Sequence, residues 1–284
     1  MEKLLALLGF THFRAHGEAG PAQEILQHQG PFRADALPRT STIPANGWRI
    51  SLTREWQCCL LCEGSSDTAL TNVLELLITR ITSEDASVED RSDLKGTVKS
   101  KLESIRDNDI DIYDLIFIHR DADNVGYTTR FNQITKDVHD ASNKAITSSS
   151  VQIPVIPTIP VTMTETWALA SLYDKDPACQ KWLKRIASMS LSNFEQRKNT
   201  KVELEHLLRS VSPHPTLLTQ QSFGRQRASI LRSLDPTPNS MLANLPSWQA
   251  LERLLINAIY ASRPWHTPSP HSFIPVPPPL YLKK

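Results

Sequence analysis

Two short apolar runs, each ending abruptly in charged residues, dominate the pattern of the chain. Trp56–Cys62 is nearly continuous in apolar residues and stops at Glu63-Gly64, and Tyr113–His119 runs into the sequence Arg-Asp-Ala-Asp-Asn-Val-Gly. Such runs, when bounded by turns, are typical of strands buried on both faces of a parallel sheet. A third segment, Val151–Met163, is rich in Val, Ile and Pro and predicts an edge or irregular strand.

Helical patterns separate these runs. Apolar residues spaced by three and four from Leu70 to Ile81 predict an amphipathic helix, with Asp67 or a neighbouring serine available to cap it. Further helices are expected at about residues 97–106, at 127–146 and from Glu165 onwards, whereas 82–93 is a polar stretch with no predicted element. Strands alternating with helices favour right-handed βαβ units, so the predicted fold class is α/β with a mainly parallel sheet flanked by helices.

The texture of the chain predicts four parts. Residues 1–50 form a loop-rich N-terminal arm, 51–175 the α/β domain, 176–262 a helical accessory region, and 263–284 a Pro-rich tail that is largely extended or mobile. No apolar run is long enough to span a bilayer, and the apolar opening of the chain lacks a convincing cleavage site. We therefore expect a cytoplasmic protein that makes no membrane contact.

The net charge of the chain is close to zero and indicates no particular class of partner. The 284 residues include 31 Lys and Arg against 30 Asp and Glu, which excludes the overall positive field of many nucleic-acid-binding proteins. The near-zero net charge does not exclude a local basic surface. The predicted helical region carries several basic residues that could bind the phosphates of a nucleic acid. These residues are Arg197, Lys198, Lys201, Arg225, Arg227 and Arg232.

Cysteine and tryptophan positions favour structural roles. Cys58, Cys59 and Cys62 lie within one apolar run and have no second Cys-x-x-Cys to complete a zinc site, so we expect buried free thiols, as for Cys179. Trp167 is predicted to belong to the core rather than to a base-stacking platform.

Four acidic residues follow the predicted strands: Glu63, Asp121, Asp123 and Glu165. In a parallel sheet the carboxyl ends of the strands meet at one edge, so these carboxylates are expected to project from the same side. Hard cations such as Mg²⁺ take oxygen ligands and keep several waters, which makes this a candidate metal site. The competing interpretation is that each acid only forms a turn or caps a helix.

Two of these segments resemble a known family. Leu60-Leu61-Cys62-Glu63-Gly64-Ser65-Ser66-Asp67 is similar to the first motif of the TOPRIM (topoisomerase-primase) domain, and Asp121-Ala122-Asp123-Asn124-Val125-Gly126 is similar to its second. The segment from Ile153 through Glu165 to Ala170 resembles small bacterial TOPRIM proteins related to the OLD (overcoming lysogenization defect) nucleases. The resemblance covers about residues 54–174.

The resemblance implies a TOPRIM-like, Rossmann-like domain that acts as a Mg²⁺- or Mn²⁺-dependent nuclease on DNA or RNA. It makes Glu63 a metal ligand or general base, Asp121 and Asp123 metal ligands, and Glu165 a further acidic ligand. Gly64 would permit the tight turn after the first strand, and Gly126 the turn into the helix that follows the second motif. The match departs from the family where a Leu-rich run often ends in Asp, because the run here continues as Ala170-Ser171-Leu172-Tyr173-Asp174. Whether Asp174 takes the role of that acid is left open.

The relatives are frequently associated with phage defence beside a partner ATPase, so the resemblance also implies an antiviral effector with such a partner. A non-catalytic or partner-activated regulatory subunit that docks on an ATPase is the alternative function, and a homo-oligomer is left open. A strand-passing or primase role is disfavoured, because no tyrosine-centred cleavage domain and no zinc module is evident in the sequence.

Overall fold

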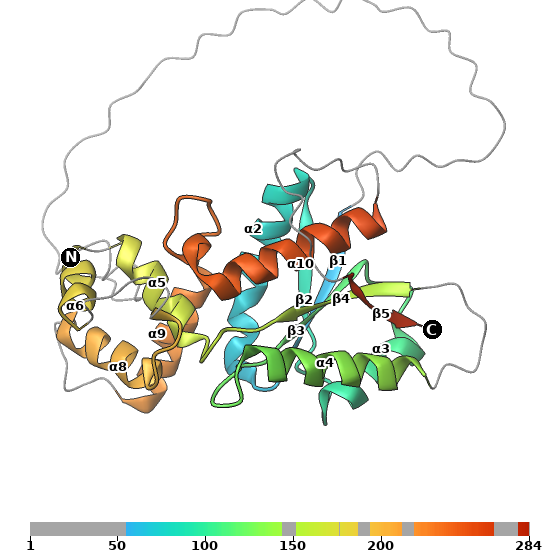
Figure 1. Cartoon of the computed structure of the whole chain (residues 1–284), viewed down its shortest axis with the longest axis horizontal. Coiled ribbons are helices and arrows are strands. Elements are labelled where there is room, and N and C mark those ends of the chain that lie inside the picture. Colours follow the sequence, from blue (N-terminus) through green and yellow to red (C-terminus); the bar gives the residue numbers. More distant parts are fainter. Residues whose placement is uncertain are drawn as a thin grey trace, which may run out of the picture. The chain divides into compact units, whose positions relative to one another are not determined.

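A five-stranded sheet forms the centre of the protein (Figure 1). The structure is a computed structural model that describes residues 55–143, 152–175, 177–186, 194–211, 219–263 and 278–283; the predicted N-terminal arm, 1–50, lies outside them. The strand order is β2-β1-β3-β4-β5, with the first four strands parallel and β5 antiparallel to β4. The predicted α/β class with a mainly parallel sheet is confirmed.

The strands are β1 (Trp56–Cys62), β2 (Ala86–Asp90), β3 (Leu115–His119), β4 (Gln152–Thr158) and β5 (Leu280–Lys283). The helices are η1 (Ser65–Leu70), α2 (Thr71–Thr82), α3 (Val98–Asn108), α4 (Tyr127–Ser142), α5 (Glu165–Lys175), α6 (Pro177–Ile186), α8 (Thr200–Val211), α9 (Gln220–Arg232), η3 (Leu242–Asn244) and α10 (Pro246–Ser262). No helix in these described ranges is both long and apolar enough to cross a membrane.

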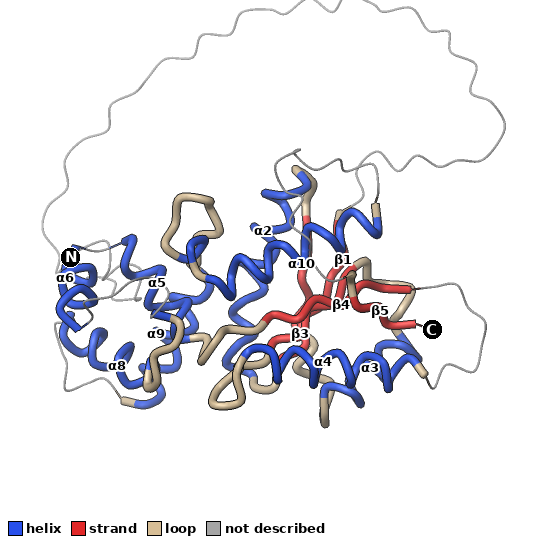
Figure 2. The backbone as a smooth tube through the Cα atoms, viewed as in Figure 1, coloured by secondary structure: helices blue, strands red, loops and turns tan. Residues whose placement is uncertain are grey.

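The two central strands are apolar throughout because the sheet is covered on both faces. Successive side chains of a strand point to opposite faces. Leu60 and Phe117 accordingly pack in one core with α2 and α10, while Leu61 and Ile118 pack in a second core with α3 and α4. Figure 2 shows the strands between these two helical layers. The cysteines of β1 are free and buried in these cores, as predicted.

Two strands were not expected. β2 lies inside the polar stretch 82–93, where only Val88 of its five residues is buried, and an edge strand of this kind leaves no apolar run in the sequence. β5 lies in the Pro-rich tail, where Leu282 is buried and the strand pairs with β4. The prediction of an extended tail is right for this segment, but the strand belongs to the sheet.

The helices after β4 continue the core beyond the sheet. α5 packs against α6, α8 and α9, and α9 also contacts η1 and α2. Their apolar residues belong to the same core as β1 and α2. α10 then returns to the sheet and packs on β4, beginning with Pro246 in its first turn, where a missing N–H costs nothing. Trp167 of α5 is fully buried, which confirms its predicted place in the core.

Candidate functional site

The carboxyl ends of three neighbouring strands meet at one edge of the sheet. Cys62 of β1 is level with His119 of β3, and His119 is level with Thr158 of β4. The loop after β3 is bound to the segment after β4, because the Asp123 N–H donates to the Thr162 carbonyl at 2.9 Å. This register brings the segments that carry all four predicted acids to the same edge.

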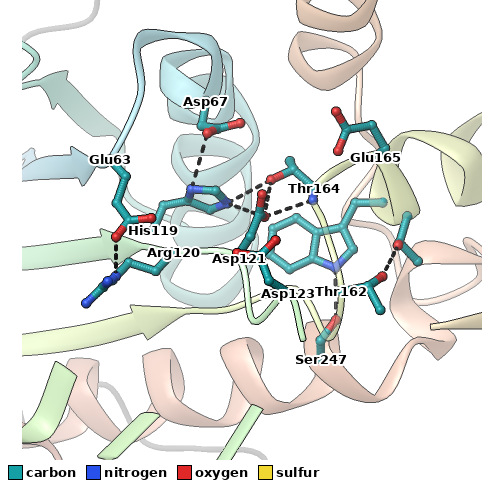
Figure 3. Close-up of polar contacts among 12 residues, drawn as sticks. Glu63, Asp67, His119, Arg120, Asp121, Asp123, Thr162, Thr164, Glu165 and Ser247 are labelled. Carbon is teal, nitrogen blue, oxygen red and sulfur yellow. Dashed lines mark hydrogen bonds and ion pairs between the residues drawn. The ribbon is translucent and has the colours of Figure 1, made fainter. Parts of the chain in front are cut away.

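A hydrogen-bonded chain lies at the centre of this edge (Figure 3). The backbone N–H and the hydroxyl of Thr164 both donate to Oδ1 of Asp121, at 2.9 and 2.8 Å. The same hydroxyl lies 2.9 Å from Nε2 of His119. Since the single hydroxyl proton of Thr164 is donated to Asp121, its oxygen must accept from His119, which assigns a proton to Nε2. The chain therefore runs from His119 through Thr164 to Asp121.

His119 lies between two carboxylates. Its Nδ1 is 3.7 Å from Oδ2 of Asp67, and its Nε2 is 3.7 Å from Oδ1 of Asp121. Neither Asp67 nor a neighbouring serine caps the helix as expected, because η1 and α2 have no side-chain cap, and Asp67 is buried beside His119 instead. This geometry pairs His119 with carboxylates on both sides of its ring.

Arg227 of α9 enters the site from the helical region. Its Nε donates to Oε1 of Glu165 at 2.8 Å, and its Nη2 donates to Oδ1 of Asp67 at 2.7 Å. The side chains of Arg227 and Glu165 are only 7% and 4% exposed. Arg227 was grouped with cations that could track phosphates, and this expectation is wrong, because a buried guanidinium bound to two carboxylates does not face solvent. Arg225, Arg232, Lys198 and Lys201 are exposed.

Glu63 and Asp123 lie at the solvent-exposed margin. The Glu63 side chain is 50% exposed, and its Oε1 is 2.6 Å from Nε of Arg120. The Asp123 side chain is 49% exposed and lies 3.5 Å from Nη2 of Arg130. Figure 3 shows Glu63 directed toward Arg120, whereas Asp121 and Asp123 share one loop. Two of the four predicted acids are thus exposed, and the other two belong to the buried site.

The loop that carries Asp121 and Asp123 depends on Gly126. This residue directly precedes α4, at its N-cap, with a φ of 81°, a backbone conformation that residues with a Cβ rarely adopt. The predicted turn at Gly126 is confirmed. Asp174 does not join the acids, because its Oδ2 accepts from the N–H of Met241 at 2.6 Å and fixes the loop before η3.

Burial changes the acidity of the central carboxyl group. Desolvation raises the pKa of Asp121, and the negative charges of Asp67 and Glu165 act in the same direction. His119 and the hydrogen bond from Thr164 oppose the shift. A cation that entered this cluster would relieve the repulsion among its carboxylates.

The donor set suits a hard cation, although its members do not yet form a coordination sphere. Across the part of the chain that the structure describes, no group of three or more His, Cys, Asp or Glu side chains could hold a metal ion. The available ligands are carboxylate oxygens, which Mg²⁺ prefers. Oε2 of Glu165 is buried and has no hydrogen-bond partner, so this oxygen is chemically available. The ligand atoms are therefore of the type that Mg²⁺ binds. In this structure three of the carboxylates are paired with arginines instead: Glu63 with Arg120, and Asp67 and Glu165 with Arg227.

Sequence reasoning found the acids next to the strand ends but missed three partners. Thr164 precedes Glu165, and its role follows only from the pairing of the loops after β3 and β4. Asp67 stood inside the first motif but was considered only as one of the residues available to cap a helix. Arg227 is 160 residues from Asp67 and carries no motif, so nothing in the sequence indicated this contact. No protein-family model matches the chain, and no curated protein or solved structure matches it.

Replacing Thr164 by Val should destabilise the protein by about 1–3 kcal/mol, because the isosteric change leaves a buried His119 N–H without its acceptor and removes one donor to Asp121. Urea unfolding of the purified variant measures this cost. Thr135→Val is the matched control, since the Thr135 hydroxyl bonds only to a carbonyl of its own helix. Equal stability of the two variants would contradict a structural role for the hydrogen bonds that link His119, Thr164 and Asp121.

Proposed function

We propose that the protein is a Mg²⁺-dependent nuclease of TOPRIM type that hydrolyses phosphodiester bonds in DNA or RNA. One observation carries the proposal. β1 and β3 are parallel neighbours with Cys62 level with His119, so Glu63 and the Asp121–Asp123 pair leave the sheet at the same edge. This placement is the one that the resemblance of the two motifs implies.

The residues of the chain would divide the chemistry as follows. Asp121 and Asp123 would hold Mg²⁺, and Glu165 would complete the site. Bound Mg²⁺ would polarise the phosphodiester and activate a water for attack. Glu63 is half exposed and is oriented by Arg120, so its carboxylate is accessible to bind or deprotonate that water. By resemblance alone, we further propose an effector of antiviral defence that works beside a partner ATPase.

A second candidate function is supported by the engagement of the acids. Glu63 is paired with Arg120, Asp123 with Arg130 and Glu165 with Arg227. A site in which protein cations neutralise the carboxylates suits a partner-activated regulatory subunit that docks on an ATPase. In that case the purified chain alone would neither bind a divalent cation nor cleave nucleic acid.

Cleavage assays on the purified protein separate the two functions. Supercoiled plasmid, single-stranded DNA and total tRNA are incubated with Mg²⁺ or Mn²⁺, and we expect Glu63→Ala and Asp123→Ala each to lower the rate by at least about 10²-fold. Asp111→Ala is the control, because this exposed acid lies before β3, at the opposite end of the strand. Full activity in both site variants would refute the proposed nuclease site. Absence of cleavage, with no metal binding by calorimetry, would support the regulatory subunit.

A further inference from the structure

Arg227 connects the helical region to the acidic site by bridging two carboxylates. One guanidinium binds Glu165 of α5 and Asp67 of η1, at 2.8 and 2.7 Å. Its helix, α9, is held in the core by Phe223, Ile230 and Leu231, which are all buried. Arg227 is thus one of the contacts that hold α9 against α5 and η1.

The charge balance shows what the guanidinium does there. Burial by itself lowers the pKa of Arg227, but the charges of Glu165, Asp67 and Asp121 outweigh burial and raise it. Arg227 is thus stabilised by three carboxylates from three segments of the chain. It occupies the position of a counter-ion, because it neutralises acids that would otherwise repel one another in a medium of low dielectric constant.

One buried oxygen of the cluster still lacks a partner. Oε2 of Glu165 has no hydrogen bond, although the Glu165 side chain is only 4% exposed. A buried carboxylate oxygen without a donor is costly unless a cation or another ligand satisfies it in some state of the protein. This oxygen belongs to the same carboxylate that Arg227 binds, so the guanidinium leaves the site incompletely satisfied.

We propose that Arg227 is an internal latch: it holds Asp67 and Glu165 in the resting protein and must leave them before these carboxylates can bind a divalent cation. The inference rests on the proposed metal function and adds to it that α9 controls access to Asp67 and Glu165. While the guanidinium is bound to both carboxylates, its positive charge repels a divalent ion from the remaining oxygens, such as Oε2 of Glu165. By reciprocity, a cation that displaces Arg227 also loosens α9.

The latch is tested by Mn²⁺ binding to the full chain, measured by calorimetry for wild type, Arg227→Met and Arg225→Met. Met keeps much of the apolar stem of Arg227 and removes its charge. We expect Arg227→Met to bind Mn²⁺ at least tenfold more tightly than wild type, and Arg225→Met, on the exposed side of the same helix, to bind like wild type. Equal or weaker affinity in Arg227→Met would overturn the latch and make Arg227 a structural link.

The outcomes separate the latch from the nuclease. If wild type binds Mn²⁺ and cleaves nucleic acid while Arg227→Met gains no affinity, the latch fails and the proposed function stands. If no protein of the set binds Mn²⁺, both fail.

A measurement on the wild type covers the case in which Arg227→Met does not fold. Hydrogen exchange of the backbone amides is compared with and without saturating Mn²⁺. The latch predicts faster exchange in α9 and unchanged exchange in α3, which contributes nothing to the acidic cluster. Unchanged or slower exchange in α9 would overturn it.

Discussion

Asp121→Asn should abolish Mg²⁺-dependent cleavage while leaving the protein at least as stable as the wild type. Asn keeps the Oδ1 acceptor that receives both hydrogen bonds from Thr164, so the loop after β3 stays in place. The variant loses the negative charge that would hold the metal, and we expect the rate to fall by about 10³-fold or more. It also loses a buried charge that Asp67 and Glu165 repel.

Cleavage rate and thermal unfolding are measured on the same preparation. A large drop in both activity and Tm would contradict the prediction, because it would show that the charge of Asp121 is needed for folding. Retained activity would remove Asp121 from the proposed mechanism. Asp111→Asn is the control for a general effect of removing an acid from this part of the chain.

The pH dependence of this variant follows from the same carboxyl group. The pKa of Asp121 in the folded protein lies above its usual value of 3.8, mainly because the group is buried. The folded state therefore binds the proton more tightly than the unfolded state, and the stability that this provides is lost as pH rises through the folded pKa. In metal-free buffer the Tm advantage of Asp121→Asn should be smallest near pH 4 and grow as the pH increases. An advantage that shrinks with pH would contradict the shift.

The fold could be predicted wherever burial leaves a pattern in the sequence. β1 and β3 are buried on both faces, so they appear as apolar runs. β2 and β5 are the two edges of the sheet and have one buried residue each, Val88 and Leu282. An edge strand is completed by backbone hydrogen bonds to its neighbour, and these depend on no particular side chain. The missed strands are therefore the ones that tertiary context defines.

The site divides in the same way. Glu63, Asp121 and Asp123 could be found because each directly follows a recognisable strand. Asp67 and Arg227 could not, because their contact joins η1 to α9 across the helical region, and long-range pairs of this kind have no spacing rule. The sequence also suggested four acids free to bind a metal, whereas three of them are paired with arginines. The three arginine partners could not be inferred from the positions of the acids.

Trp167→Ala should destabilise the protein by about 3–5 kcal/mol, the range for removing a large buried aromatic side chain. Trp167 is fully buried, packs edge to face on Trp248 with ring centroids 5.1 Å apart, and donates from Nε1 to the Ser247 hydroxyl at 2.9 Å. These contacts hold α5 against the start of α10. Urea unfolding measures the loss, and Trp182→Ala, at a partly buried position of α6, should cost clearly less.

Trp167→Phe separates packing from hydrogen bonding. Phe keeps most of the aromatic contact with Trp248 but cannot donate to Ser247, so its cost should be a minor part of that of the alanine variant. The position also matters for the site, because Glu165 lies two residues earlier in the first turn of α5 and is held there by Arg227. If α5 is fixed by Trp167, the alanine variant should loosen this contact and bind Mn²⁺ differently from wild type, while the phenylalanine variant should not. Equal costs for Trp167→Ala and Trp182→Ala would mean that α5 is positioned by other contacts.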